Sequence, residues 1–255
     1  MVIKMIILVD IGNTNIVVGI AKENKILKTF RMSTDSSLTD DEYAGKMKGF
    51  GINQYEIEGA AISSVVPQLD HVFIDLFVKH YNIKPLVVGA GVKSGLKLKI
   101  DNQKQLGADL LCDCVGAYAK YPGDLLVVDL GTATKLLAVN KNKEYIGCSI
   151  APGIIGSINS LVASAAKLPN ISLAVPSKTI ETETTRCIQS GAIIGHACMI
   201  NGLLSKMKKE MNTENIKVIL TGGLSRLVKD LLEHEVLDEP NILLEGLLYI
   251  YYKNI

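Results

Sequence analysis

The sequence predicts an α/β protein made of two similar halves. Short runs rich in valine, isoleucine and leucine, typical of buried strands, alternate with longer segments of helical periodicity. One strand–turn–strand pattern also occurs twice: Met5–Asn15 resembles Leu125–Lys135, with Asp10 aligned to Asp129, 129 − 10 = 119 residues later. Hydrophobic residues make up 48% and charged residues 21% of the 255 residues, as in folded soluble domains.

In the first half, two kinds of pattern define the elements. Short apolar runs predict strands at 5–9, 16–21, 26–32, 60–66 and 85–89. Thr39 to Glu42 (TDDE) matches the capping box that opens a helix, and Leu69 to Phe77 has helical spacing. A helix at 105–121 closes this half. The boundary falls near Pro122-Gly123, which predicts domains 1–120 and 121–255.

The second half repeats the order of strands followed by helices. Strands are expected at 125–128, before Asp129, and at 136–139, 145–150 and 217–220. Helices are expected at 154–167, 185–211, 225–233 and 242–252. Each half therefore begins with a β-hairpin that leads into helices.

Charge and cysteine usage limit the partners and the compartment. The 27 basic and 26 acidic residues leave a net charge of +1, so no strong field favours nucleic acid or an anionic membrane as a partner. The five cysteines are odd in number and lack the CxxC spacing of a zinc site, which is typical of buried thiols in a reducing compartment. We find no signal core or uninterrupted membrane-length apolar run and expect a cytoplasmic protein.

The two Asp-x-Gly hairpins carry the chemistry. Glycine amides approach phosphate oxygens closely, hydroxyls such as those of Thr14, Thr132 and Thr134 can donate to them, and carboxylates can hold a magnesium ion. A single Asp-x-Gly is an ordinary turn, but its duplication after two apolar strands favours a phosphate and metal cradle. No P-loop or dinucleotide fingerprint is present.

Across nearly the whole chain, an ordered set of motifs resembles the type III pantothenate kinases. The motifs are Asp10–Asn15 (DIGNTN), Gly107–Asp109, Asp129–Thr134 (DLGTAT), Pro152-Gly153, Leu168-Pro169, Ser190-Gly191, Thr221–Gly223 and Leu244–Leu247. The resemblance implies two ribonuclease H-like domains of the actin-like ATPase superfamily, with ATP in a cleft between them. It also implies a homodimeric kinase that phosphorylates pantothenate in coenzyme A biosynthesis with ATP, Mg²⁺ and a monovalent cation, K⁺ or NH₄⁺.

The resemblance also assigns roles to individual residues. It implies that Asp109 is the general base and that Asp10 and Asp129 lie at the metal ions, with Asp129 at the monovalent cation. The implied ATP-binding residues are Asp10, Ile11, Gly12, Asn13, Thr14, Asn15, Ile16, Val17, Thr132, Gly222 and Gly223. The implied pantothenate-binding residues are Ile100, Gly107, Ala108, Asp109, Leu110 and Thr184. Without the resemblance, Asp109 is also explained as a carboxylate at a helix amino terminus.

Several positions depart from the family pattern, and they are concentrated on the acceptor side. Leu110 replaces an arginine, Ile100 a tyrosine, Gln103 a proline, and Glu183 the asparagine before Thr184. A leucine cannot replace the planar hydrogen-bonding fork of a guanidinium group. Two functions therefore stay open: a pantothenate kinase with a weakened or altered acceptor site, or a degenerate relative with an ATP-binding accessory role.

Lys135 is a further departure, directly after the second hairpin turn. The family has an uncharged residue here, and the lysine ammonium could take the place of the monovalent cation beside Asp129. Strand alternation could instead point Lys135 to solvent.

Overall fold

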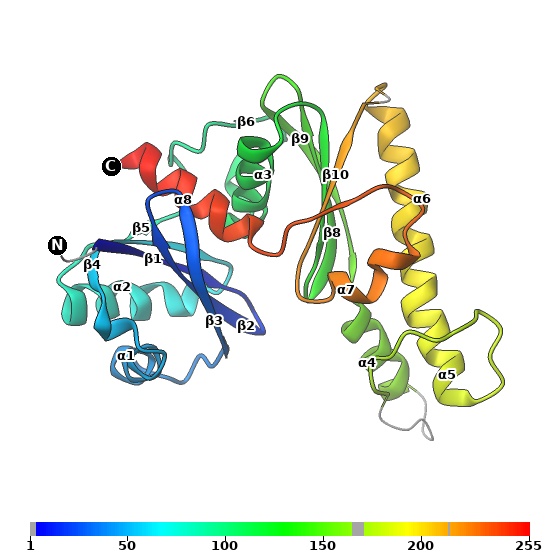
Figure 1. The fold of residues 1–255 in the computed structure, drawn as a ribbon, viewed down its shortest axis with the longest axis horizontal. Helices are drawn as coiled ribbons and strands as arrows, with labels where there is room; N and C mark the ends of the chain where they lie inside the picture. Colours follow the sequence, from blue (N-terminus) through cyan, green and yellow to red (C-terminus); the bar gives the residue numbers. More distant parts are fainter. Residues whose placement is uncertain (1–3, 165–170, 214) are drawn as a thin grey trace. The chain divides into compact units, whose positions relative to one another are not determined.

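The computed structural model describes residues 4–164, 171–213 and 215–255 and divides into two compact units (Figure 1). Unit 1 comprises Met1–Lys120 and Asn241–Ile255, and unit 2 comprises Tyr121–Pro240. The last helix therefore belongs to unit 1, whereas the sequence assigned it to a domain 121–255. The Leu168-Pro169 motif and the expected end of a helix at 167 lie outside the described residues.

Unit 1 contains a mixed five-stranded sheet with the strand order β3-β2-β1-β4-β5. Its strands are β1 (Lys4–Ile11), β2 (Asn15–Lys22), β3 (Lys25–Ser33), β4 (Glu56–Ser64) and β5 (Leu86–Val87). β1 pairs antiparallel with β2 and parallel with β4. The helices are α1 (Asp40–Gly49), α2 (Pro67–Tyr81), α3 (Ala108–Lys120) and α8 (Ile242–Asn254), with short turns at 52–54 and 103–105 and a two-residue strand β6 (Lys97–Leu98).

The two faces of the unit 1 sheet are covered by different helices (Figure 1). Ile7, Val9 and Ile11 of β1 share a core with α1 and α2. Ile6 and Leu8 share a second core with α3 and α8. Because successive side chains in a strand point to opposite faces, Asp10 lies at the end of β1 on the side of α3 and α8.

Unit 2 repeats this sheet topology with the order β11-β10-β7-β8-β9. Its strands are β7 (Leu125–Leu130), β8 (Ala133–Asn140), β9 (Glu144–Pro152), β10 (Lys217–Thr221) and β11 (Leu237–Asp238). The pairs β7–β8 and β8–β9 are antiparallel, while β7–β10 and β10–β11 are parallel. The strands β9, β8, β7, β10 and β11 correspond in order to β3, β2, β1, β4 and β5 of unit 1. The repeat in the sequence is therefore also a repeat of the sheet.

The unit 2 helices pack on one face of this sheet. They are α4 (Ile154–Ser164), α5 (Thr184–Gln189), α6 (Gly195–Glu210) and α7 (Ser225–Val228), with a π-helical turn at Ser190–Ile194 and a short turn at Lys229–Leu231. Leu126, Val128 and Leu130 of β7 form a core with Ile200 and Leu204 of α6. The sequence predicted one helix at 225–233, whereas the structure has one turn of α-helix, α7, followed by a 3₁₀ turn at Lys229–Leu231.

Local signals in the sequence place the first helix correctly. The Thr39 hydroxyl accepts the Glu42 backbone amide, and the Glu42 carboxylate accepts the Thr39 amide at 2.8 Å, which completes the capping box.

The expectation that the cysteines are buried is only partly met. All five are free, and Cys112 and Cys114 are buried, but Cys148, Cys187 and Cys198 are exposed.

One helical stretch, Thr184–Glu210, is long and apolar enough to cross a membrane by length and composition alone. About half of its most apolar window, 44%, is buried inside the protein. Ile193, Ile200 and Leu204 of this stretch pack in the unit 2 core. A core helix passes the same test, so the stretch is weak grounds for a membrane span.

Candidate active site

The first hairpin turn is fixed by a threonine that follows β3. The Gly12 amide donates to the Asn15 carbonyl at 3.0 Å, and the Thr34 amide donates to the Thr14 carbonyl at 3.1 Å. The Thr34 hydroxyl donates to the Gly12 carbonyl at 2.6 Å. Asn13 and Thr14 are exposed at the tip of this turn. The turn therefore presents polar groups on a backbone that is already held in place.

Asp10 is held by a neighbour from the adjacent parallel strand. Ser63 lies opposite Asp10 in the β1–β4 register, and its hydroxyl donates to Asp10 Oδ1 at 3.0 Å. Ser63 is completely buried and also hydrogen-bonds the Cys112 thiol of α3. Burial, followed by the charges of Asp10, Asp113 and Asp109, raises the pKa of the Cys112 thiol well above its usual range. The thiol is therefore an inert hydrogen-bonding group in this network.

Asp109 stands in the first turn of α3, close to the same thiol. Asp109 Oδ1 accepts the Leu110 amide at 2.8 Å, so the carboxylate folds back over the start of the helix. A Cβ atom on Gly107 would lie 2.4 Å from that oxygen, so a side chain at position 107 would require the Asp109 carboxylate to move. Asp10 and Asp109 thus both act on the Cys112 thiol by their charge, and Ser63 hydrogen-bonds both Asp10 and that thiol; we call these residues the Asp10–Ser63–Asp109 cluster of unit 1.

The second hairpin turn is built against two other glycine motifs. The Gly131 amide donates to the Ala133 carbonyl at 3.1 Å, and the Gly153 amide donates to the Thr132 carbonyl at 3.2 Å. A Cβ atom on Gly153 would lie 2.4 Å from the Thr132 carbonyl oxygen. Gly222 has a φ of +92°, and a Cβ there would lie 2.5 Å from the Leu130 backbone. Both glycines let backbone approach the turn closely.

Asp129 is paired with Lys135 across the second hairpin. The two residues are directly opposite in the β7–β8 register, and Lys135 Nζ donates to Asp129 Oδ2 at 2.7 Å. The side chains are only 15% and 12% exposed. The alternative that Lys135 points to solvent is therefore wrong. Asp129 Oδ1 lies against the Gly222 backbone, where a Cβ would approach it to 2.6 Å.

Some residues expected in the nucleotide site have side chains in the interior. Ile11 and Ile16 are fully buried in the core with α1 and α2, so only their backbone atoms could contact a ligand. Thr134 is also fully buried, and its hydroxyl lies 2.7 Å from Nε2 of His196, a ring whose pKa is lowered by burial. The expected phosphate contact of the Thr134 hydroxyl is therefore wrong, because this group is used in the core. Thr132 and Gly223 are exposed.

The expected acceptor residues fall in both units. Gly107, Ala108, Asp109 and Leu110 lie at the start of α3, and the Leu110 side chain is buried at 8% exposure. Ile100 is half-buried in the preceding loop. Thr184 begins α5 in unit 2 and borders a mostly apolar cavity of about 630 Å³ with Ile158, Leu161 and Cys187 among its lining residues.

Two departures from the family pattern have local structural roles. Glu183 caps α5, because its carboxylate accepts the Thr185 and Arg186 amides at 2.9 and 3.1 Å. Gln103 donates its side-chain amide to the Leu98 carbonyl at 2.9 Å and so fixes the loop before α3. Neither residue is freely available as a ligand-binding group.

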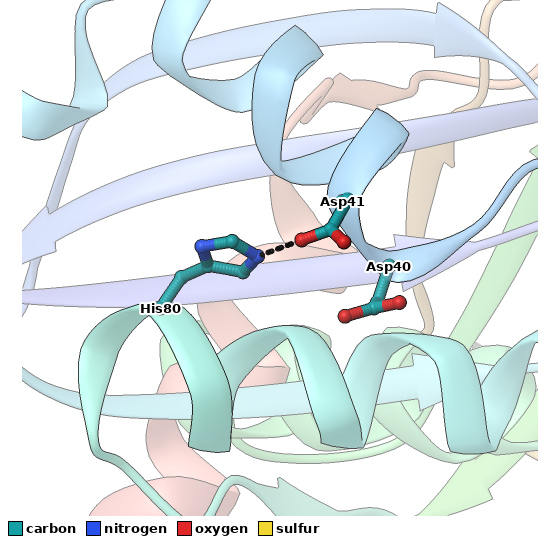
Figure 2. Close-up of side chains that lie close together, drawn as sticks. All are labelled: Asp40, Asp41 and His80. Carbon is teal, nitrogen blue, oxygen red and sulfur yellow. Dashed lines mark hydrogen bonds and ion pairs between the residues drawn. The ribbon is translucent and has the colours of Figure 1, made fainter.

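A separate cluster joins α1 to α2 (Figure 2). His80 Nε2 lies 2.9 Å from Asp41 Oδ1, and Asp40 completes a group with metal-ligand spacing in the described part of the chain. Lys79 Nζ, however, donates to Asp41 at 2.7 Å and to Asp40 at 3.1 Å. The hydrogen bond from Lys79 holds the pKa of Asp41 below its usual range. The lysine already supplies the cation, so we interpret the cluster as an ion-paired helix–helix contact.

Sequence reasoning missed Thr34 and Ser63 as residues of the site. Thr34 follows β3 without any local motif, and only the β2–β3 pairing places it beside Gly12. Ser63 is one of two serines ending an apolar strand, and only the parallel register with β1 selects it over Ser64. In both cases the residue is identified by the pairing between strands, which the sequence analysis did not provide.

Comparison with solved structures defines the class of fold. A Sinorhizobium meliloti protein assigned as a 2-dehydro-3-deoxygalactonokinase superposes with a TM-score of 0.63 at 13% identity, covering 97% of this chain and 96% of that chain. A Campylobacter jejuni protein assigned as a Baf family transcriptional activator superposes with a TM-score of 0.59 at 16% identity, covering 97% and 98%. The chain shares its fold with these proteins, and its two repeated α/β sheets confirm the predicted fold class.

Sequence comparison then gives the family. Residues 6–206 match the family profile of type III pantothenate kinase. The type III pantothenate kinase of Exiguobacterium sibiricum is 40% identical over 254 residues, covering 98% of this chain and 100% of that protein. The chain belongs to the type III pantothenate kinase family. The predicted family and kinase class are thereby confirmed, and membership implies the use of ATP and a divalent metal ion.

Proposed function

We propose that this chain uses Mg²⁺ and ATP to phosphorylate pantothenate to 4′-phosphopantothenate, the first phosphorylation in coenzyme A biosynthesis. The observation that carries the proposal is that two carboxylates from the family's motifs, Asp10 and Asp109, both act electrostatically on the buried Cys112 thiol, and that Ser63 hydrogen-bonds Asp10. We propose further that the protein acts in the cytoplasm as a homodimer, without nucleic acid or membrane as partners. Its balanced charge of +1 supports the last point.

The two hairpin turns are the proposed phosphate-binding loops. Asn13 and Thr14 would donate to ATP phosphates from a turn that is fixed by the Gly12 amide and by Thr34, while Gly12 itself, which has no side chain, would let a phosphate approach closely. Thr132 is exposed on the second turn and would contribute its hydroxyl there. Gly222 and Gly223, which follow β10, would lie at the nucleoside, where the lack of side chains admits a flat ring. In each loop the backbone is ordered before the ligand arrives.

Asp10 fits a divalent cation on its donor chemistry. Mg²⁺ prefers carboxylate and water oxygens, and Asp10 offers a carboxylate whose Oδ1 is already oriented by Ser63. When bound, Mg²⁺ neutralises phosphate charge and favours in-line phosphoryl transfer. Asp10 is therefore the residue of unit 1 that we assign to holding this ion, and Ser63 is the residue that positions it.

Asp109 would act as the base at the acceptor. Its carboxylate takes the proton from the pantothenate hydroxyl while the hydroxyl oxygen attacks the γ-phosphorus and ADP leaves with the bridging oxygen. The bond from the Leu110 amide orients Oδ1. Gly107, Ala108, Leu110, Ile100 and Thr184 are the proposed contacts for the rest of pantothenate.

An ADP-release assay with and without pantothenate tests this function. ATP-dependent ADP release that requires pantothenate, with formation of 4′-phosphopantothenate, is the expected result. Nucleotide binding without turnover would instead support the ATP-binding accessory role. The apolar Leu110 in place of the family's arginine is the feature that favours that second function.

Leu110 gives a direct prediction about the acceptor site. We expect Leu110→Arg to lower the KM for pantothenate about 10-fold or more, because a hydrogen bond to a charged group contributes about 1.5–3 kcal/mol. Steady-state kinetics at saturating ATP measure the effect. Leu110→Met is the matched control, since it keeps an apolar side chain of similar volume at this buried position. An unchanged KM in Leu110→Arg would show that an arginine at this position does not strengthen pantothenate binding.

Ser63 gives a prediction about the metal side of the site. We expect Ser63→Ala to raise the Mg²⁺ concentration needed for half-maximal rate about 10-fold, because Asp10 loses a hydrogen bond to its charged group. Calorimetric titration of Mg²⁺ with ADP provides a second readout that does not depend on turnover. Ser64→Ala is the control, because Ser64 hydrogen-bonds the nearby Val66 backbone instead. Equal Mg²⁺ requirements in both variants would show that Ser63 does not position Asp10.

A further inference from the structure

The family resemblance implies a monovalent cation at Asp129, and the residues present do not fit one. Lys135 Nζ already lies 2.7 Å from Asp129 Oδ2, within a side-chain pair that is largely shielded from solvent. The Gly222 backbone packs against the other carboxylate oxygen. A K⁺ ion at Asp129 would therefore lie beside a second cation, which repels it, and would compete for a carboxylate that is already charge-balanced.

The position of Lys135 is fixed by the strand pairing. Asp129 and Lys135 face each other in the β7–β8 register, so their side chains leave the sheet on the same face. A stem of four methylenes then needs to span only one interstrand gap to reach the carboxylate. The pair is thus a consequence of the hairpin register together with the identity of residue 135.

We infer that the Lys135 ammonium is a built-in monovalent cation, which makes this enzyme independent of K⁺ and NH₄⁺. The inference rests on the proposed kinase function and deepens it. An ammonium group carries the same charge as K⁺ and donates three hydrogen bonds, so it can hold Asp129 beneath the second phosphate loop. Because it is covalently attached, its occupancy does not depend on the salt in the medium.

The first test measures the salt dependence of the reaction. Initial rates are recorded with ATP and pantothenate in choline chloride, with KCl replacing it at constant ionic strength. We expect the wild-type rate to change less than about twofold, because the charge at Asp129 is already balanced. We expect Lys135→Met to lose at least about 10-fold in rate without K⁺ and to regain rate as K⁺ is added, because a hydrogen-bonded charge is lost. Lys135→Arg, which keeps the charge, stays independent of K⁺.

Lys141→Met is the matched control. Lys141 follows the same strand and is exposed, so this variant loses an equal charge away from Asp129. We expect its rate and its response to KCl to equal those of the wild type. A steep K⁺ requirement in the wild type would overturn the inference, and so would the absence of any K⁺ response in Lys135→Met.

A binding readout separates this inference from the proposed function. Unfolding temperatures in KCl and in choline chloride are compared at equal ionic strength for the wild type, Lys135→Met and Lys141→Met. A K⁺-specific rise only in Lys135→Met supports the built-in cation even if no variant phosphorylates pantothenate. A K⁺-specific rise in the wild type contradicts it even if the enzyme is active.

Discussion

Asp109→Asn is expected to lower kcat about 10²–10⁴-fold, the range typical of a lost general base. Asparagine has nearly the same shape, and its side-chain oxygen can still accept the Leu110 amide that Asp109 Oδ1 accepts at 2.8 Å. The start of α3 is therefore preserved. The side-chain amide of the asparagine, however, cannot take the proton from the pantothenate hydroxyl. The loss should appear in turnover, while the affinities for ATP and pantothenate change little.

Pantothenate-dependent ADP release measures the rate, and calorimetric titration measures the two affinities. Asp101→Asn is the control, because it makes the same chemical change at an exposed position in the loop before α3. We expect that variant to match the wild type. Full turnover by Asp109→Asn would remove Asp109 from the mechanism and leave positioning of the two substrates as the main source of catalysis.

The halves of the molecule were predictable because their signal is local. Buried strands and the Asp-x-Gly turns repeat in the sequence, and the structure shows the same sheet order in both units. The capping box at Thr39 is equally local, because all its hydrogen bonds join residues three apart. Such features depend on a few neighbouring side chains and need no knowledge of the remaining fold.

The direction of Lys135 was not predictable from the repeat. In the first hairpin the residue opposite Asp10 is Val17, 17 − 10 = 7 positions later. In the second hairpin the residue opposite Asp129 is Lys135, 135 − 129 = 6 positions later. Had the second turn matched the first, Leu136 would oppose Asp129. A shift of one residue sends a side chain to the other face, so this one difference in turn length decides the ion pair.

The placement of the last helix was missed for a different reason. Residues 241–255 follow unit 2 in the sequence but belong to unit 1, where α8 packs on α3. The apolar pattern of α8 alone does not mark its partner, since both units offer apolar surfaces. The Leu244–Leu247 motif contained the missing information. Its glycine, Gly246, is a contact point between the two helices.

Gly246→Ala is expected to destabilise the protein by about 3 kcal/mol, the upper end of the usual range for overpacked interiors. A Cβ atom on Gly246 would lie 1.9 Å from the Cys112 carbonyl oxygen and 2.7 Å from the Gly116 amide nitrogen. A Cβ on Gly116 would in turn lie 2.2 Å from the Ile242 carbonyl oxygen. The two helices therefore touch backbone to backbone, and neither can yield by changing a side-chain rotamer.

Urea unfolding measures this effect, with Gly202→Ala in α6 as the matched control. A Cβ atom on Gly202 would have no neighbour within 4 Å beyond the backbone of its own helix, so alanine there should stabilise the helix by up to about 1 kcal/mol. Separation of α8 from α3 would also move the helix that carries Asp109 and Cys112, so we expect Gly246→Ala to lose turnover. Unchanged stability would show that the close α3–α8 contact does not form in solution. Lost stability with full turnover would show that Asp109 does not depend on it.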